Sequence, residues 1–137
     1  MIIFPVFAEL EQKRDEINAH FHKETEPQLV ERVQQFGFVP VQPGDLKHML
    51  LKEKSTSNEY LLTFRPYEIR VEFCHIKTQE KILICEISNF NLSAHTIMNI
   101  LIASIDSWLQ YGIIYDYRKA QEFEKREGKQ TLFSVTM

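Results

Sequence analysis

The chain has 137 residues, of which 44% are hydrophobic, 26% are charged and only 4 are glycine, a composition typical of globular proteins. This length supplies one continuous core, so we expect a single domain over residues 1–137. The net charge of -3 disfavours nucleic acid as a partner, because attraction to a polyanion needs clustered Lys and Arg.

Two helices are predicted in the N-terminal third. Five side chains recur there at alternating spacings of three and four residues: Phe7, Leu10, Arg14, Ile17 and Phe21. This period predicts a helix from Pro5 to Lys23. Thr25, with Gln28 three residues later, is typical of a capped helix start, and Gly37 is typical of a helix end. A second helix is therefore expected between Thr25 and Gly37.

Residues 46–90 predict an antiparallel meander. Short β-rich runs alternate there with turn-forming segments, at residues 46–54, 59–64, 67–76 and 80–90. Run lengths and connections of this kind are typical of strands joined by hairpins. The segment QTLFSVTM at residues 130–137 predicts a last strand, so we expect a sheet of four or five strands.

Residues 92–112 predict a long helix, capped near Asn91 or Ser93 and ended by Gly112. Its polar positions form only a narrow strip, so we expect burial on more than one side. The helix is expected to pack on the apolar face of the sheet, with the N-terminal helices completing the layer and part of its surface in a dimer interface. Residues 115–128 predict a short polar helix. The fold class is therefore α+β.

Strand alternation predicts the registers of two hairpins. If Phe64 pairs with Ile69 in the first hairpin and Phe73 with Leu83 in the second, one face of the sheet becomes wholly apolar. The competing register of the second hairpin, shifted by one residue, would place Glu86 among apolar side chains, and an unpaired buried carboxylate is costly. We prefer the first register, although neither turn contains the glycine that short hairpin loops favour.

The second face of the sheet would carry mixed side chains, and we expect another element, a second copy or another protein to cover it. Arg70 would lie opposite Glu86 there as a cross-strand ion pair among isoleucines. The residues predicted to make the interaction are Arg70, Glu72, Ile82, Ile84, Glu86 and Trp108. For Trp108, an ordinary core position is the preferred alternative. We predict that Ile84→Asp disturbs association and leaves the secondary structure largely intact.

The two cysteines are not predicted to form a site. The same alternation directs Cys85 into the core and Cys74 to the second face, which excludes a disulfide or a shared metal between them. His75 would point away from its neighbour Cys74, so the two cannot act as a thiolate–imidazole pair.

Other chemistry-bearing patterns are also incomplete. In HFHKETE, His22 and Glu26 share a helix face at four-residue spacing, as do His20 and Glu24, but a zinc site needs three or four ligands. No serine or cysteine lies on a glycine-flanked turn, and no glycine-rich phosphate loop is present. We therefore expect no metal, no cofactor and no catalytic residues.

These observations favour a non-catalytic protein-binding module that docks to itself as a homodimer or to another protein, in an accessory, inhibitor, immunity or chaperone-like role. The pair of cysteines and the absence of a signal-peptide pattern favour the cytoplasm. Polar residues interrupt the apolar stretch at 97–114, so no membrane span is expected. The alternative is an apolar-ligand-binding protein or a modest enzyme, with a pocket between the long helix and the sheet lined by Tyr60, Phe64, Phe73 and Trp108.

Overall fold

The N-terminal helices form one continuous helical run. The computed structural model describes residues 5–120. Helix α1 (Pro5–His20) continues through a π-helical turn, η1 (Phe21–Thr25), into α2 (Glu26–Phe36). The predicted break before Thr25 is wrong, because Thr25 has helical dihedrals and its side chain caps no backbone N–H. The predicted end is confirmed: the Gly37 N–H donates to the carbonyl oxygens of Val33 and Gln34.

Five antiparallel strands follow in the order in which they occur along the chain. Their bounds are β1 (Val39–Pro40), β2 (His48–Lys52), β3 (Glu59–Phe64), β4 (Ile69–Cys74) and β5 (Lys81–Ile87). This arrangement confirms the predicted α+β class with a meander sheet, and β1 supplies the fifth strand. The strand predicted at residues 130–137 lies outside the described residues, and so does the predicted polar helix beyond residue 120.

The register of β3 on β4 is the predicted one, with Phe64 opposite Ile69. The register of β4 on β5 is as predicted only as far as Val71, which lies opposite Cys85. A β-bulge then shifts the pairing by one residue. Glu72 consequently lies opposite Leu83, where the prediction placed Phe73, and each of the two registers considered for this hairpin holds on one side of the bulge.

Helix α3 (Ala94–Tyr111) has the predicted limits. The Ser93 side chain accepts a hydrogen bond from the Thr96 N–H at 3.1 Å, which caps the start of the helix. Gly112 ends the helix in the left-handed conformation, with a φ of 63°. Among the described residues, no helix is both long and apolar enough to cross a bilayer.

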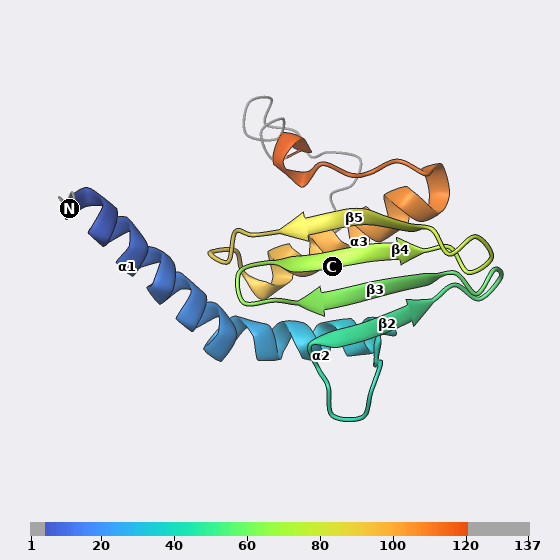
Figure 1. Cartoon of the computed structure of the whole chain (residues 1–137), viewed down its shortest axis with the longest axis horizontal. Coiled ribbons are helices and arrows are strands. Elements are labelled where there is room, and N and C mark those ends of the chain that lie inside the picture. Colours follow the sequence, from blue (N-terminus) through green and yellow to red (C-terminus); the bar gives the residue numbers. More distant parts are fainter. Residues whose placement is uncertain (1–4, 121–137) are drawn as a thin grey trace.

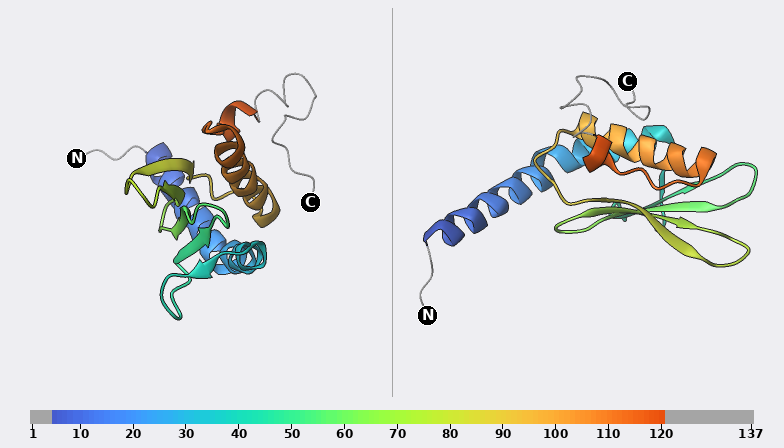
Figure 2. Two further views of the ribbon diagram at one scale, coloured as in Figure 1. Left: turned by 90° about the vertical axis from the view of Figure 1, so that its right-hand side faces the viewer. Right: turned by 90° about the horizontal axis from the view of Figure 1, so that it is seen from above.

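The helices and the sheet form two layers. Helices α2 and α3 lie side by side on one face of the sheet, and no described element lies on the other face (Figures 1 and 2). The core between the layers includes Leu29 and Val33 of α2, Leu62 and Val71 of the sheet, and Leu101 of α3. We call the uncovered side of the sheet the open face.

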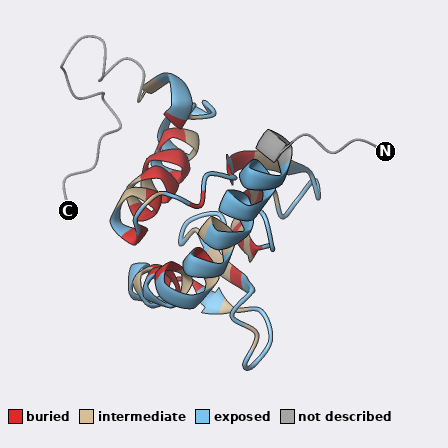
Figure 3. Cartoon of the chain, turned by 90° about the vertical axis from the view of Figure 1, so that its left-hand side faces the viewer, coloured by how far each residue is buried: buried red, intermediate tan, exposed pale blue. Residues whose placement is uncertain are grey.

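Most of α1 does not join this layer, contrary to the prediction. It extends past the edge of the sheet, and its surface is exposed over most of its length (Figures 1 and 3). Leu10 is 58% exposed, although it belongs to the predicted apolar face. The end of α1 reaches the core through Ile17, and Phe21 at the start of η1 is fully buried.

Candidate functional site

The open face of the sheet is the candidate site, and its side chains form rows that cross the strands. Residues directly opposite each other on antiparallel strands place their side chains on the same face, so the pairings define these rows. The central row crosses all five strands and consists of Val39, Leu50, Leu61, Glu72 and Leu83. Val39 is 58% exposed, and the other members are partly exposed.

Polar side chains flank the central row on both sides. The polar row consists of His48, Thr63, Arg70 and Glu86. The charged row consists of Lys52, Glu59, Cys74 and Lys81. Within the charged row, Lys52 and Glu59 form a cross-strand ion pair with 3.7 Å between Nζ and Oε2. The open face therefore carries one narrow apolar band between two polar borders.

Arg70 and Glu86 lie directly opposite each other, as predicted, but the expected ion pair between them is absent. Neither side chain makes an ion pair or a hydrogen bond with any residue in the described part of the chain. The Arg70 Nε atom is shielded from solvent without a hydrogen-bond partner. Glu72, in the middle of the apolar band, likewise has no such partner among residues 5–120.

Three of the six predicted interaction residues lie on the open face, namely Arg70, Glu72 and Glu86. The other three lie on the core side. Ile84 is 1% exposed within the core cluster, and Ile82 lies opposite Phe73 and packs against that cluster. The prediction that these isoleucines lie on the second face is wrong. The bulge turns the side chain of Ile84 to the core, and Leu83 and Ile82, which precede it in β5, each lie on the face opposite to the predicted one.

Trp108 occupies the core position preferred for it. Its ring lies 5.5 Å from the Phe73 ring, centroid to centroid, and Phe73 lies 5.4 Å from Tyr60. Tyr60, Phe64 and Phe73 are all buried. The rings fill the space that a ligand would need between α3 and the sheet, so the pocket alternative gains no support from these residues.

Sequence reasoning missed most of the apolar band. The predicted pairing of Phe73 with Leu83 puts Leu83 on the core face, whereas the bulge turns it to the open face beside Glu72. Val39 and Leu50 are absent from the predicted interaction residues, although Leu50 alternates with the exposed His48 and Lys52 along β2. Strand alternation in β2, extended to the strands that pair with it, could have identified these residues from the sequence.

Both cysteines lie where alternation placed them, and neither forms a disulfide. Cys85 is buried in the core, and this burial raises the pKa of its thiol to about 11. Cys74 is partly exposed in the charged row, and partial burial raises the pKa of its thiol as well. Both shifts disfavour the thiolate, which is the reactive form.

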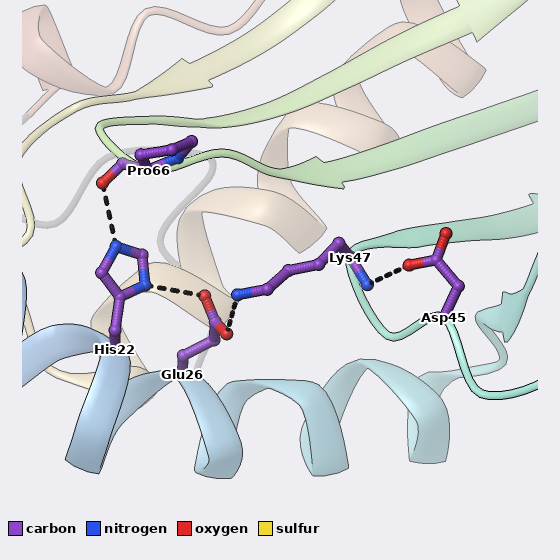
Figure 4. A network of polar contacts seen from close by, with 5 residues as sticks. All are labelled: His22, Glu26, Asp45, Lys47 and Pro66. Carbon is purple, nitrogen blue, oxygen red and sulfur yellow. Dashed lines mark hydrogen bonds and ion pairs between the residues drawn. The ribbon is translucent and has the colours of Figure 1, made fainter.

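A second polar cluster joins the helical run to the sheet (Figure 4). The Nε2 atom of His22 lies 2.9 Å from the Pro66 carbonyl oxygen, in the turn between β3 and β4. The Nδ1 atom lies 3.0 Å from Oε1 of Glu26, whose Oε2 lies 2.5 Å from Nζ of Lys47. Both partners of the imidazole are acceptor oxygens, so a ring nitrogen that carries a proton donates to the oxygen it faces.

This cluster is structural rather than metal-binding. It contains one histidine and one carboxylate in contact, and across the described residues no group of three or more His, Cys, Asp or Glu side chains is placed to hold a metal ion. The His22 ring also contacts Phe90 edge-on, at 5.6 Å between ring centroids. The predicted four-residue contact is therefore real, and its partners Pro66 and Lys47 could not be read from local spacing.

Comparisons with models of protein families, with curated proteins and with solved structures found no match to this chain.

Proposed function

We propose that this chain is a non-catalytic protein-binding module that docks a protein partner on the open face of its sheet. The observation that carries the proposal is the central row, in which Leu50, Leu61 and Leu83 remain partly exposed and no described helix or strand covers them. Apolar side chains that gather in one band on a surface are typical of interaction sites.

The architecture supports this role. A sheet that is hydrophobic on one face is stable as a two-layer domain, and its other face is then free to be polar. Here the free face carries apolar side chains on four of its five strands, which the two-layer fold does not require. Removing this band from water on docking would supply about 25 cal/mol for each Å² of apolar area buried.

Chemistry elsewhere supports binding rather than catalysis. The raised pKa values of Cys74 and Cys85 disfavour a thiolate nucleophile. The partner is a second protein or another copy of this chain, and the free thiols fit a reducing compartment such as the cytoplasm.

Affinity capture from the native host tests the proposal, with the full chain as bait in three forms. The first is the wild type, the second is Leu61→Lys in the central row, and the third is Leu109→Lys as a control on α3, where Leu109 is 55% exposed. We expect the wild type and the control to retain the same partner and Leu61→Lys to lose it. Retention of that partner by Leu61→Lys, with an unchanged dissociation constant for the purified pair, would contradict the proposal.

A further inference from the structure

The shape of the apolar band restricts what can cover it. The central row spans five strands, and neighbouring strands lie about 4.8 Å apart, so the band is about 19 Å long. Side chains on the same face of a strand are spaced by about 7 Å, and the next row on each side is polar. The band is therefore about 19 Å long and only one side chain wide.

A band of this shape suits a helix better than a second sheet. Two sheets that pack face to face interdigitate several rows of apolar side chains from each partner. The polar and charged rows would leave His48, Arg70 and Lys81 buried in such a contact. A helix instead presents a single apolar stripe, and about 13 residues of α-helix span 19 Å. The same argument disfavours a second copy of this sheet as the occupant.

The charges on the band restrict the occupant further. Glu72 lies between Leu61 and Leu83, and a partner that covers these leucines also removes the Glu72 carboxylate from water. An unpaired buried carboxylate is costly, so the partner needs a cationic side chain opposite Glu72. Arg70, two residues away on the same face, has no partner among the described residues and needs an acceptor. A helix laid along the central row carries the side chains at one border of its apolar stripe over the polar row, so one of them can meet Arg70 while the centre of the stripe meets Glu72.

We propose that the open face receives an amphipathic helix of a partner protein, laid across the strands, with Lys or Arg at the centre of its apolar stripe and Asp or Glu at the border of the stripe that lies over Arg70. This inference rests on the proposed function and specifies the partner. The apolar side chains of the helix contact Leu50, Leu61 and Leu83, and its cationic side chain pairs with Glu72.

The probe for the test is a displayed library of peptides of about 14 residues, with a helical apolar stripe and randomised residues at its centre and edges. The immobilised target is the full chain, first as the wild type and then as Glu72→Lys. We expect the wild type to enrich peptides with Lys or Arg at the stripe centre, and Glu72→Lys to enrich Asp or Glu at that position. Selected peptides should bind Leu61→Lys at least about ten-fold more weakly, and should bind the control Tyr111→Lys unchanged.

The inference is overturned if no enriched peptide depends on Leu61, or if the central residue does not change its charge between the two targets. It is also overturned if the wild type is a dimer in light scattering and Leu61→Lys is a monomer, because a second copy then occupies the face. If a captured partner is lost with Leu61→Lys but crosslinks to the open face through a non-helical segment, this inference fails while the proposed function stands.

Discussion

The imidazole of His22 and the carbonyl group of Pro66 are joined across 2.9 Å, and this contact ties the helical run to the turn between β3 and β4. A second contact reaches the same turn, because the Arg14 guanidinium lies 5.6 Å from the centre of the Tyr67 ring. The π-helical turn at Phe21–Thr25 contains His22 and lies where α1 leaves the sheet. The direction of α1 therefore depends on the β3–β4 turn.

Replacement of His22 by phenylalanine tests this attachment. Phenylalanine keeps a ring against Phe90 but removes both ring nitrogens, so the Pro66 carbonyl loses this contact and Glu26 is left with Lys47 alone. We expect the free energy of unfolding to fall by about 1–2 kcal/mol in urea denaturation. The control is His20→Phe, two residues earlier at an exposed position, which should change it by less than about 0.5 kcal/mol. Equal effects of the two substitutions would show that the contact is not stabilising.

Ile84 in β5 and Leu61 in β3 lie on opposite faces of the sheet, because the bulge turns Ile84 to the core. Ile84 is 1% exposed, so an aspartate there would bury an unpaired carboxylate, and we now expect Ile84→Asp to unfold the chain. This corrects the expectation that Ile84→Asp spares the secondary structure. Leu61→Asp on the open face should leave the far-ultraviolet circular dichroism spectrum unchanged and lower the free energy of unfolding by about 1 kcal/mol or less. A folded Ile84→Asp variant would contradict the register of β5.

The sequence predicted the order and type of the elements because their signals are local. The apolar alternation of β3 and β4, the Ser93 cap and the glycine at position 112 each act within a few residues. The bulge opposite Val71 was not predicted, because inserting one residue into a strand leaves no mark on composition. The same bulge limited the prediction of the site. Glu72 was correctly predicted to lie on the open face, but Leu83 was predicted to lie in the core because the register shift was not foreseen.

The continuity of α1 with α2 was missed for a related reason. Thr25 and Pro27 are typical of a helix start, but here Thr25 is the last residue of the π-helical turn and Pro27 lies in the first turn of α2. The helical run contacts the sheet at this point through His22 and Pro66, and 44 residues separate these positions in sequence. A long-range contact of this kind cannot be read from spacing.

Gly37 is predicted to be the most sensitive of the described glycines to substitution. Its φ of 132° is rarely adopted by residues with a side chain, and an added Cβ would lie 3.1 Å from Cδ1 of Leu51. Gly112 has a φ of 63° with open space around it. Thermal unfolding should therefore show a larger loss of stability for Gly37→Ala, about 2 kcal/mol, than for Gly112→Ala, about 1 kcal/mol. The reverse order would show that α3 depends more on its C-terminal cap than α2 does.

The buried thiol of Cys85 predicts a loss of stability in alkali. Burial raises its pKa from 9.0 to about 11, so the unfolded chain ionises first as the pH rises. The stability that the neutral thiol contributes is complete below about pH 9 and is lost as the pH rises towards about 11. A shift of this size corresponds to a loss on the order of 2 kcal/mol near pH 10.5.

Comparison with Cys85→Ala isolates this contribution, because the raised pKa of Tyr60 affects both proteins equally. Cys85→Ala should be less stable than the wild type near pH 8, since it removes buried volume, and the difference should shrink by about 2 kcal/mol near pH 10.5. Cys74→Ser, on the open face, should lose the same stability at alkaline pH as the wild type.

A thiol reagent at neutral pH should modify Cys74 in the folded chain and Cys85 only after unfolding, since only Cys85 is enclosed by the core. Fast modification of Cys85 in the folded chain would contradict the burial of this side chain in the core.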